Sequence, residues 1–258
     1  EKSVSELKAR NIFKTVKYEV SDDASKDLKV IDIFVEEKPT GEISAGAGFG
    51  TNGGTFAINI KENNWLGAGK SVGFDFEIDQ ETVSGSLNFS DPNYNFLGNE
   101  VFYSVASIKN EKPDSGYENS IISGSIGTGF EQYQDIFINL DVSNFYEKLE
   151  TSDLATAHKK KQEGDYFENL FSYSLNLNKL NQNFQPTDGY YFGFAQTLPI
   201  ISDDNAVENR FNVSKYYMIN DELLLSAKFL ARSINSLDSD VRVSKRIYIP
   251  SSRLRGFQ

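Results

Sequence analysis

Strict alternation of apolar and polar residues is the feature that most constrains the fold of this chain. The segment 171–179 is the clearest case, because Phe171, Tyr173, Leu175 and Leu177 alternate with serine and asparagine. Successive side chains of a β-strand point to opposite faces, so this pattern predicts a strand with one apolar and one polar face. The same alternation occurs at 42–50, 54–62, 71–79, 82–90 and 135–144, and further strands are expected near 100–109, 120–130, 189–198, 208–218 and 222–233.

About eleven strands are therefore predicted between residues 41 and 235, and two architectures accommodate them. In a soluble sandwich the apolar face packs on a second sheet, whereas in a membrane barrel it faces lipid and the polar face lines a lumen. Many of the runs reach the roughly 9 to 11 residues that cross a bilayer, while sandwich strands are nearer 5 or 6. The length favours the barrel, with Phe74, Phe76, Ile138 and Leu175 facing outward.

Composition excludes several functional classes. The 258 residues contain no cysteine and one histidine, and carry a net charge of -11. Thiolate sites, imidazole-based metal or triad chemistry and phosphate-driven nucleic-acid binding are therefore not expected. An apolar run long enough for a transmembrane helix is also lacking.

Two groups of charged residues are interpreted as structural. Asp75 and Glu77 lie on the polar face of one predicted strand, where lining a lumen is a better explanation than acid–base chemistry. His158 and the run 159–161 lie within a long charged loop, at 146–169, that has the composition of a short surface helix. The turns at 51–54 and 79–81 are short and the one at 110–116 is long, which predicts the asymmetry of an outer-membrane barrel, with short periplasmic turns and long external loops.

The N-terminal region has a different pattern. Ser3 and Glu6 have capping-box spacing, which predicts a helix over residues 3–14. Two apolar-rich runs, 15–20 and 28–37, flank a polar segment and predict a hairpin. Together they make a partial α+β module of about 40 residues, too small to hold a core alone.

Four motifs carry a resemblance to a known family. They are "NNWLGAGKSVGFDF" at 63–76, "SDPNYNFLGN" at 90–99, "QPTDGYYFGF" at 185–194 and "LRGFQ" at 254–258. In this order, on an alternating pattern and after a helix–hairpin module, they resemble the BamA outer-membrane assembly family. Residues 1–39 resemble the C-terminal part of a polypeptide-transport-associated (POTRA) repeat.

The resemblance implies an architecture for the whole chain. The family's barrel has sixteen strands, with the arginine–glycine–phenylalanine motif on a long external loop after the eleventh. Residues 40–258 are then expected to be the N-terminal two-thirds of a barrel in the bacterial outer membrane. The N-terminal module is expected in the periplasm, and the chain is expected to be a portion of a larger protein.

The resemblance also implies a function, which is non-enzymatic folding and insertion of client barrel proteins. In that family a client strand adds to the first barrel strand at a lateral seam. Here the seam strand consists of Glu42, Ile43, Ser44, Ala45, Gly46, Ala47 and Gly48, and the loop motif consists of Arg255, Gly256 and Phe257. Expected partners are unfolded outer-membrane proteins, periplasmic accessory lipoproteins and outer-membrane lipid, with no nucleic acid.

Two other functions stay open at this stage. A two-partner secretion translocase of the same superfamily shares the barrel and the loop motif but exports a soluble substrate. A passive porin-like channel shares the alternation but has no preceding module.

Overall fold

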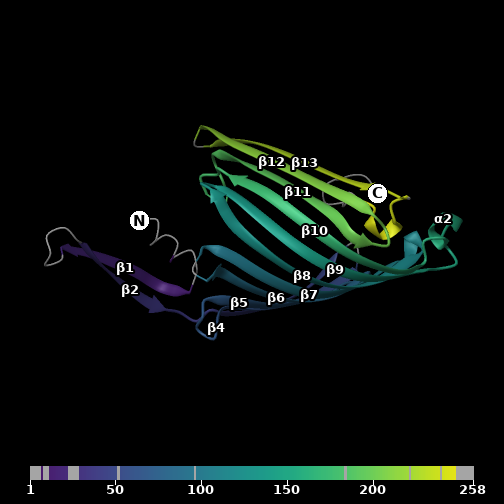
Figure 1. Cartoon of the computed structure of the whole chain (residues 1–258), viewed down its shortest axis with the longest axis horizontal. Helices are drawn as coiled ribbons and strands as arrows, with labels where there is room; N and C mark the ends of the chain where they lie inside the picture. The colour runs from purple at the N-terminus through teal and green to yellow at the C-terminus, as the bar shows by residue number, and fades with distance from the viewer. Residues whose placement is uncertain are drawn as a thin grey trace.

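The computed structural model describes residues 7, 12–22, 29–50, 53–95, 97–182, 185–220, 222–238 and 240–247. Within them, eleven antiparallel strands form one strongly curved sheet in which each strand pairs with its neighbours in the sequence (Figure 1). The strands are β3 (Gly41–Gly50), β4 (Gly53–Trp65), β5 (Lys70–Ile78), β6 (Thr82–Tyr94), β7 (Asn99–Lys112), β8 (Tyr117–Tyr133), β9 (Ile136–Thr151), β10 (Gly164–Asn178), β11 (Gly189–Ser202), β12 (Ala206–Asn220) and β13 (Leu223–Ser236). The prediction of about eleven antiparallel strands is confirmed.

The sheet remains open in the described part of the chain. Its order runs from β13 to β3, so these two strands are its edges and each pairs on one side only. Strand lengths run from 9 to 17 residues, which matches or exceeds the length that a tilted strand needs to cross a bilayer.

Strand register keeps the two faces of the sheet separate. Ser44 pairs with Asn59, Asn59 with Asp75, and Asp75 with Ser86, which makes a polar row across four strands. The opposite face pairs Phe74 with Leu87 and Ile138 with Leu175, as the alternation predicts. Phe74 and Leu175 are exposed. The described residues contain one other sheet, a two-stranded hairpin, so the eleven strands are not half of a sandwich.

The hairpin consists of β1 (Phe13–Asp22) and β2 (Lys29–Glu37), paired antiparallel as predicted. The predicted helix is wrong for residues 13 and 14, because Phe13 already pairs with Glu37 at the start of β1. Leu7 is helical, Ile12 lies in no helix, and the rest of the predicted helix lies outside the described residues.

The predicted asymmetry of the turns is wrong in part. Because strands alternate in direction, the connections β3–β4, β5–β6, β7–β8 and β9–β10 all lie at the same end of the sheet. The short turns at 51–54 and 79–81 therefore share an end with the loops that were expected opposite them. The connection predicted to be long at 110–116 is short, because β7 continues to Lys112. A 3-10 turn, Pro113–Ser115, and one glycine then lead into β8.

The charged loop predicted over 146–169 is also shorter than expected. Strand β9 continues to Thr151 and β10 begins at Gly164, so twelve residues connect them. They include the predicted helix as one turn, α2 (Ala157–Lys160), which Thr156 caps by accepting a hydrogen bond from the amide of Lys159. No helix among the described residues combines the length and apolar character needed to span a membrane.

Candidate functional site

The first candidate site is the free edge formed by β3. All seven predicted seam residues, from Glu42 to Gly48, lie in this strand. Five of them in a row are small, from Ser44 to Gly48. A Cβ added to Gly46 or Gly48 would meet no atom within 4 Å, so these glycines leave open space beside the backbone. The edge therefore has little side-chain cover.

The hydrogen bonds to β4 show which backbone groups of the edge are free to bind. Thr40 accepts a bond from the amide of Asn63, and the register from Gly41 to Gly50 continues without a shift. In an antiparallel pair, alternate residues direct both backbone groups to the partner strand. Even-numbered residues of β3 thus face β4, whereas the amides of Ile43, Ala45 and Ala47 point away from the sheet.

The second candidate site is a buried ion cluster beside the β9–β10 and β11–β12 connections, where the segment after β13 packs on the sheet. Arg242, only 3% exposed, lies 2.9 Å from a carboxylate oxygen of Glu147 and also pairs with Glu168. Its other terminal nitrogen lies 3.7 Å from Asp204. The guanidinium carbon is 3.9 Å from the ring centre of Tyr166, which is cation–π distance. Two strands, β9 and β10, and the β11–β12 turn thus converge on one side chain.

A second cation completes the cluster. Lys245 lies 2.7 Å from Glu168 and 3.7 Å from Asp204. Three carboxylates are consequently held by two cations, and all three are almost fully buried. Buried charges of this kind are retained only when they are paired.

Apolar contacts lie beside the ions. Val243 is fully buried with Leu149 and Tyr117, and its amide donates a 2.8 Å hydrogen bond to the side chain of Gln162. Outside this contact, Arg246 lies 2.9 Å from Asp240 at the exposed rim. Residues 240–247 are thereby attached to the sheet by ionic, apolar and backbone contacts.

The cluster lies on the polar face of the sheet. The row of paired residues on this face continues by strand register from Ser86 through Ala106, Ser123 and Phe145 to Glu168, although not every member is polar. Side chains of six strands, β7 to β12, line one hollow on this face, so this polar wall is the concave side of the curved sheet. Residues 240–247, at the yellow end of the coloured ribbon, lie near the same end of the sheet as α2 (Figure 1).

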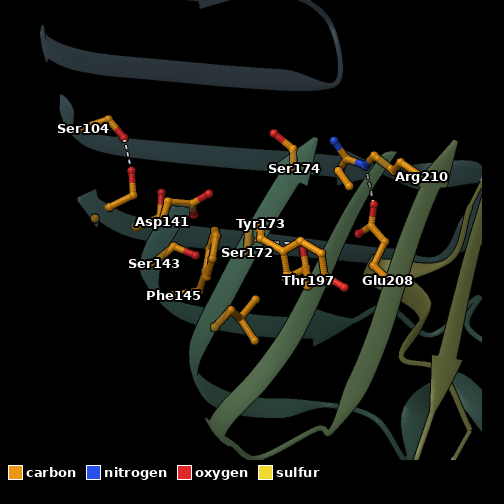
Figure 2. Close-up of a pocket in the computed structure, with 15 residues that line it drawn as sticks. Ser104, Asp141, Ser143, Phe145, Ser172, Tyr173, Ser174, Thr197, Glu208 and Arg210 are labelled. Atoms are coloured by element: carbon orange, nitrogen blue, oxygen red, sulfur yellow. Dashed lines mark hydrogen bonds and ion pairs between the residues drawn. The ribbon is translucent and has the colours of Figure 1, made fainter. Parts of the chain in front are cut away.

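Hydroxyl groups cover the middle of the polar wall. Figure 2 shows Ser104, Ser172 and Thr197 around a hollow of about 420 Å³. Ser104 bonds Ser125 at 2.7 Å, and Ser172 bonds Thr197 at 3.1 Å. These hydroxyls bond one another, and no imidazole or thiol lines the hollow to activate them. This part of the wall is therefore a polar surface without a nucleophile–base pair among the described residues.

Charged groups on the wall are paired in the same way. Glu208 lies between Arg210 and Arg232, at 2.5 and 2.8 Å. Asp75 accepts hydrogen bonds from Asn59, Ser86 and Asn88. The structural interpretation of Asp75 therefore agrees with its contacts, and the described residues contain no group of acids and histidines arranged to bind a metal.

The loop motif Arg255, Gly256 and Phe257 lies outside the described residues. The cluster around Arg242 was not predicted, because its partners are 38 to 95 positions away and nothing local in "SDVRVSKR" marks them. His158 was assigned to solvent. It is exposed, yet it contacts Asp240 at 3.1 Å and so touches the start of the same segment.

Comparison with known proteins extends over most of the chain. The model of the Omp85 superfamily domain matches residues 64–258. The outer membrane protein assembly factor BamA of Neorickettsia risticii (strain Illinois) is 25% identical over 237 residues, which are 88% of this chain and 31% of that protein.

Solved structures share the fold. BamA from Haemophilus ducreyi lacking POTRA domains 1-3 aligns with a TM-score of 0.74 at 20% identity, covering 92% of this chain and 49% of that one. CdiB from Acinetobacter baumannii aligns with a TM-score of 0.55 at 9% identity, covering 92% and 47%. The chain thus spans about a third of the curated relative and half of each solved chain.

Proposed function

The chain belongs to the Omp85 superfamily, and from that premise we propose that it is part of an outer-membrane assembly factor that folds and inserts client β-barrel proteins. The observation that carries the proposal is the small-residue run from Ser44 to Gly48 in β3, which leaves open space beside an outward-pointing backbone. The sequence likeness to an assembly factor supports it. The activity is non-enzymatic and needs no cofactor.

The mechanism follows from backbone geometry. A client strand adds to an exposed sheet edge through main-chain hydrogen bonds, which are the same for every sequence. The small residues from Ser44 to Gly48 leave room for whatever side chains the client carries. Unpaired amides within a bilayer are costly, so pairing with the client is favourable at this edge.

The remaining parts of the proposal concern location and partners. Residues 40–258 lie in the bacterial outer membrane, and residues 1–39 are the C-terminal part of a POTRA repeat in the periplasm. The hairpin β1–β2 supports the second assignment. Unfolded outer-membrane proteins are the clients, with accessory lipoproteins on the periplasmic side.

Arg255 is proposed to anchor the loop motif, since a guanidinium forms paired hydrogen bonds with a carboxylate and Gly256 permits a tight turn. A charge-assisted contact of this kind contributes about 1.5 to 3 kcal/mol. Reduced client insertion by Arg255→Ala, with Arg253→Ala at the parent level, tests this assignment.

A two-partner secretion translocase of the same superfamily is the second candidate. The fold persists at 9% identity, and one fold supports several functions. The hydroxyl-rich wall also suits the passage of a polypeptide.

The test uses the complete protein in liposomes with an unfolded outer-membrane protein as client. Ala45→Pro removes one outward amide of β3 while leaving the bonds to β4 intact, because edge strands tolerate proline where the amide faces outward. We expect the initial rate of client insertion to fall at least about tenfold, from the loss of one templating bond together with the clash of the proline ring.

Ala45→Val is the matched control, because it changes the side chain and keeps the amide, and it should insert clients at the parent rate. Equal insertion by Ala45→Pro and the parent would contradict the edge mechanism. Export of a soluble substrate by the parent, without insertion of the barrel client, would favour the translocase.

A further inference from the structure

We propose that residues 240–247 form a latch that holds the base of the loop after β13 against the polar wall, and that Arg242 is its positioning residue. Arg242 reaches β9 through Glu147, β10 through Glu168 and the β11–β12 turn through Asp204. One side chain thereby ties the loop to three separate places on the wall.

The contacts are centred on Arg242 more than on its neighbours. Arg242 is 3% exposed and stacks on Tyr166. Arg246 lies at the rim, where it pairs with Asp240 of the same segment and lies 3.2 Å from the exposed His158. Lys245 shares Glu168 and Asp204 with Arg242 but does not contact Glu147. Removing Arg242 would leave Glu147 without its cation in the docked state.

The chemistry of the latch makes it releasable. A buried ion pair gains little over its separated, hydrated partners, because desolvation offsets most of the attraction. The fully buried apolar contact of residues 240–247 is limited to Val243 on Leu149 and Tyr117. When the segment leaves the wall, Glu147, Glu168 and Asp204 become hydrated side chains of a polar surface, so the released state carries no large apolar penalty.

The latch has a functional consequence. Arg242 sets the position of residues 240–247 on the polar wall. We expect this position to affect the rate of client insertion, and that expectation rests on the proposed function. The docking of residues 240–247 does not depend on it.

The experiment measures docking in the complete protein in outer-membrane vesicles. Val243→Cys places a thiol at a position that is 0% exposed, and these 258 residues contain no other cysteine. Its rate of reaction with a water-soluble maleimide reports release, with the protein lacking Val243→Cys labelled in parallel. Arg242→Met should raise this rate on the order of 100-fold, because breaking a buried ion pair from one side is strongly destabilising.

Two variants make the result specific. Arg242→Lys should restore part of the protection, since ammonium keeps the charge but lacks the planar fork. Arg246→Met, the matched control at the exposed rim, should stay within about twofold of the parent. Resistance of the folded barrel to SDS at room temperature shows that labelling reports loop release and not unfolding.

Unchanged labelling in a folded Arg242→Met protein would overturn the latch, as would an equal rise in Arg246→Met. Should Arg242→Met fail to fold, Glu147→Gln removes one carboxylate and keeps the side-chain shape. It should raise labelling about tenfold, and an unchanged rate would overturn the proposal.

Client insertion by the same variants tests the functional consequence. Slower insertion by Arg242→Met, with partial recovery by Arg242→Lys, is the expected result. Faster labelling with unchanged insertion would overturn the functional consequence and leave the latch intact. If Ala45→Pro inserted clients at the parent rate while Arg242→Met raised maleimide labelling as expected, the proposed function would be wrong and the latch would stand.

Discussion

At the scale of single residues, one glycine is required by the close approach of two backbones. Gly189 begins β11 with φ at +101°, a conformation that side chains rarely adopt. A Cβ at this position would lie 2.1 Å from the carbonyl oxygen of Lys179, which is far inside contact distance. The motif "QPTDGYYFGF" thus contains a glycine whose role is steric.

Gly189→Ala should lower the free energy of unfolding by roughly 2 to 5 kcal/mol, from backbone strain and the clash with Lys179. Gly46→Ala is the control, because its added Cβ meets nothing within 4 Å. The urea midpoint of the complete protein in detergent micelles measures both. Equal midpoints for Gly189→Ala and the parent would contradict this prediction, because they would show that the β10–β11 loop can move away from the added methyl group without loss of stability.

At the scale of elements, two of the sequence motifs form separate turns of the same kind. In the β4–β5 turn the side chain of Asn64 accepts the amide of Gly69 at 2.7 Å, and in the β6–β7 turn Asn93 accepts that of Gly98 at 2.8 Å. Each turn also follows a register shift in the preceding strand. The spacing of asparagine and glycine, five residues apart, is therefore a structural device used twice.

Asn64→Ala and Asn93→Ala should each destabilise the protein by about 0.5 to 1.5 kcal/mol, because each leaves one glycine amide without its side-chain acceptor.

Leu66 has φ at 54° in the first turn, where Asn95 has 53° in the second. Asparagine tolerates this conformation better than leucine, so Leu66→Asn should instead raise the midpoint of urea unfolding. A loss of stability in Leu66→Asn would contradict this account of the turn.

At the scale of the whole molecule, the two faces of the sheet define its environments. Val105 lies on the apolar face and is exposed, and the next residue, Ala106, lies in the polar row between Ser86 and Ser123. A barrel in the outer membrane turns the first face to lipid and the second to water.

Val105→Cys in the complete protein should react with a lipid-soluble maleimide and resist a charged one, and Ala106→Cys should show the opposite preference. The two positions are adjacent, so each is the control of the other. Reaction of both with the charged reagent, in intact outer membranes, would contradict the membrane placement of this sheet.

The alternation alone was sufficient to predict the strands and their faces. Phe74, Ile138 and Leu175 lie on the predicted face because a strand's side chains alternate whatever the strand pairs with. Adjacent strands joined by short connections pair with each other, so the number and order of strands also followed from local pattern.

Contacts between distant positions were decided only by the tertiary structure. Phe13 is a strand residue because Glu37 pairs with it, although the local spacing favours a helix. Arg242 reads in the sequence as one more charge in a polar loop, and it is buried because curvature of the sheet brings Glu147, Glu168 and Asp204 around it. Local periodicity specifies which way each side chain points, but the pairing of charges depends on where the folded chain returns to itself.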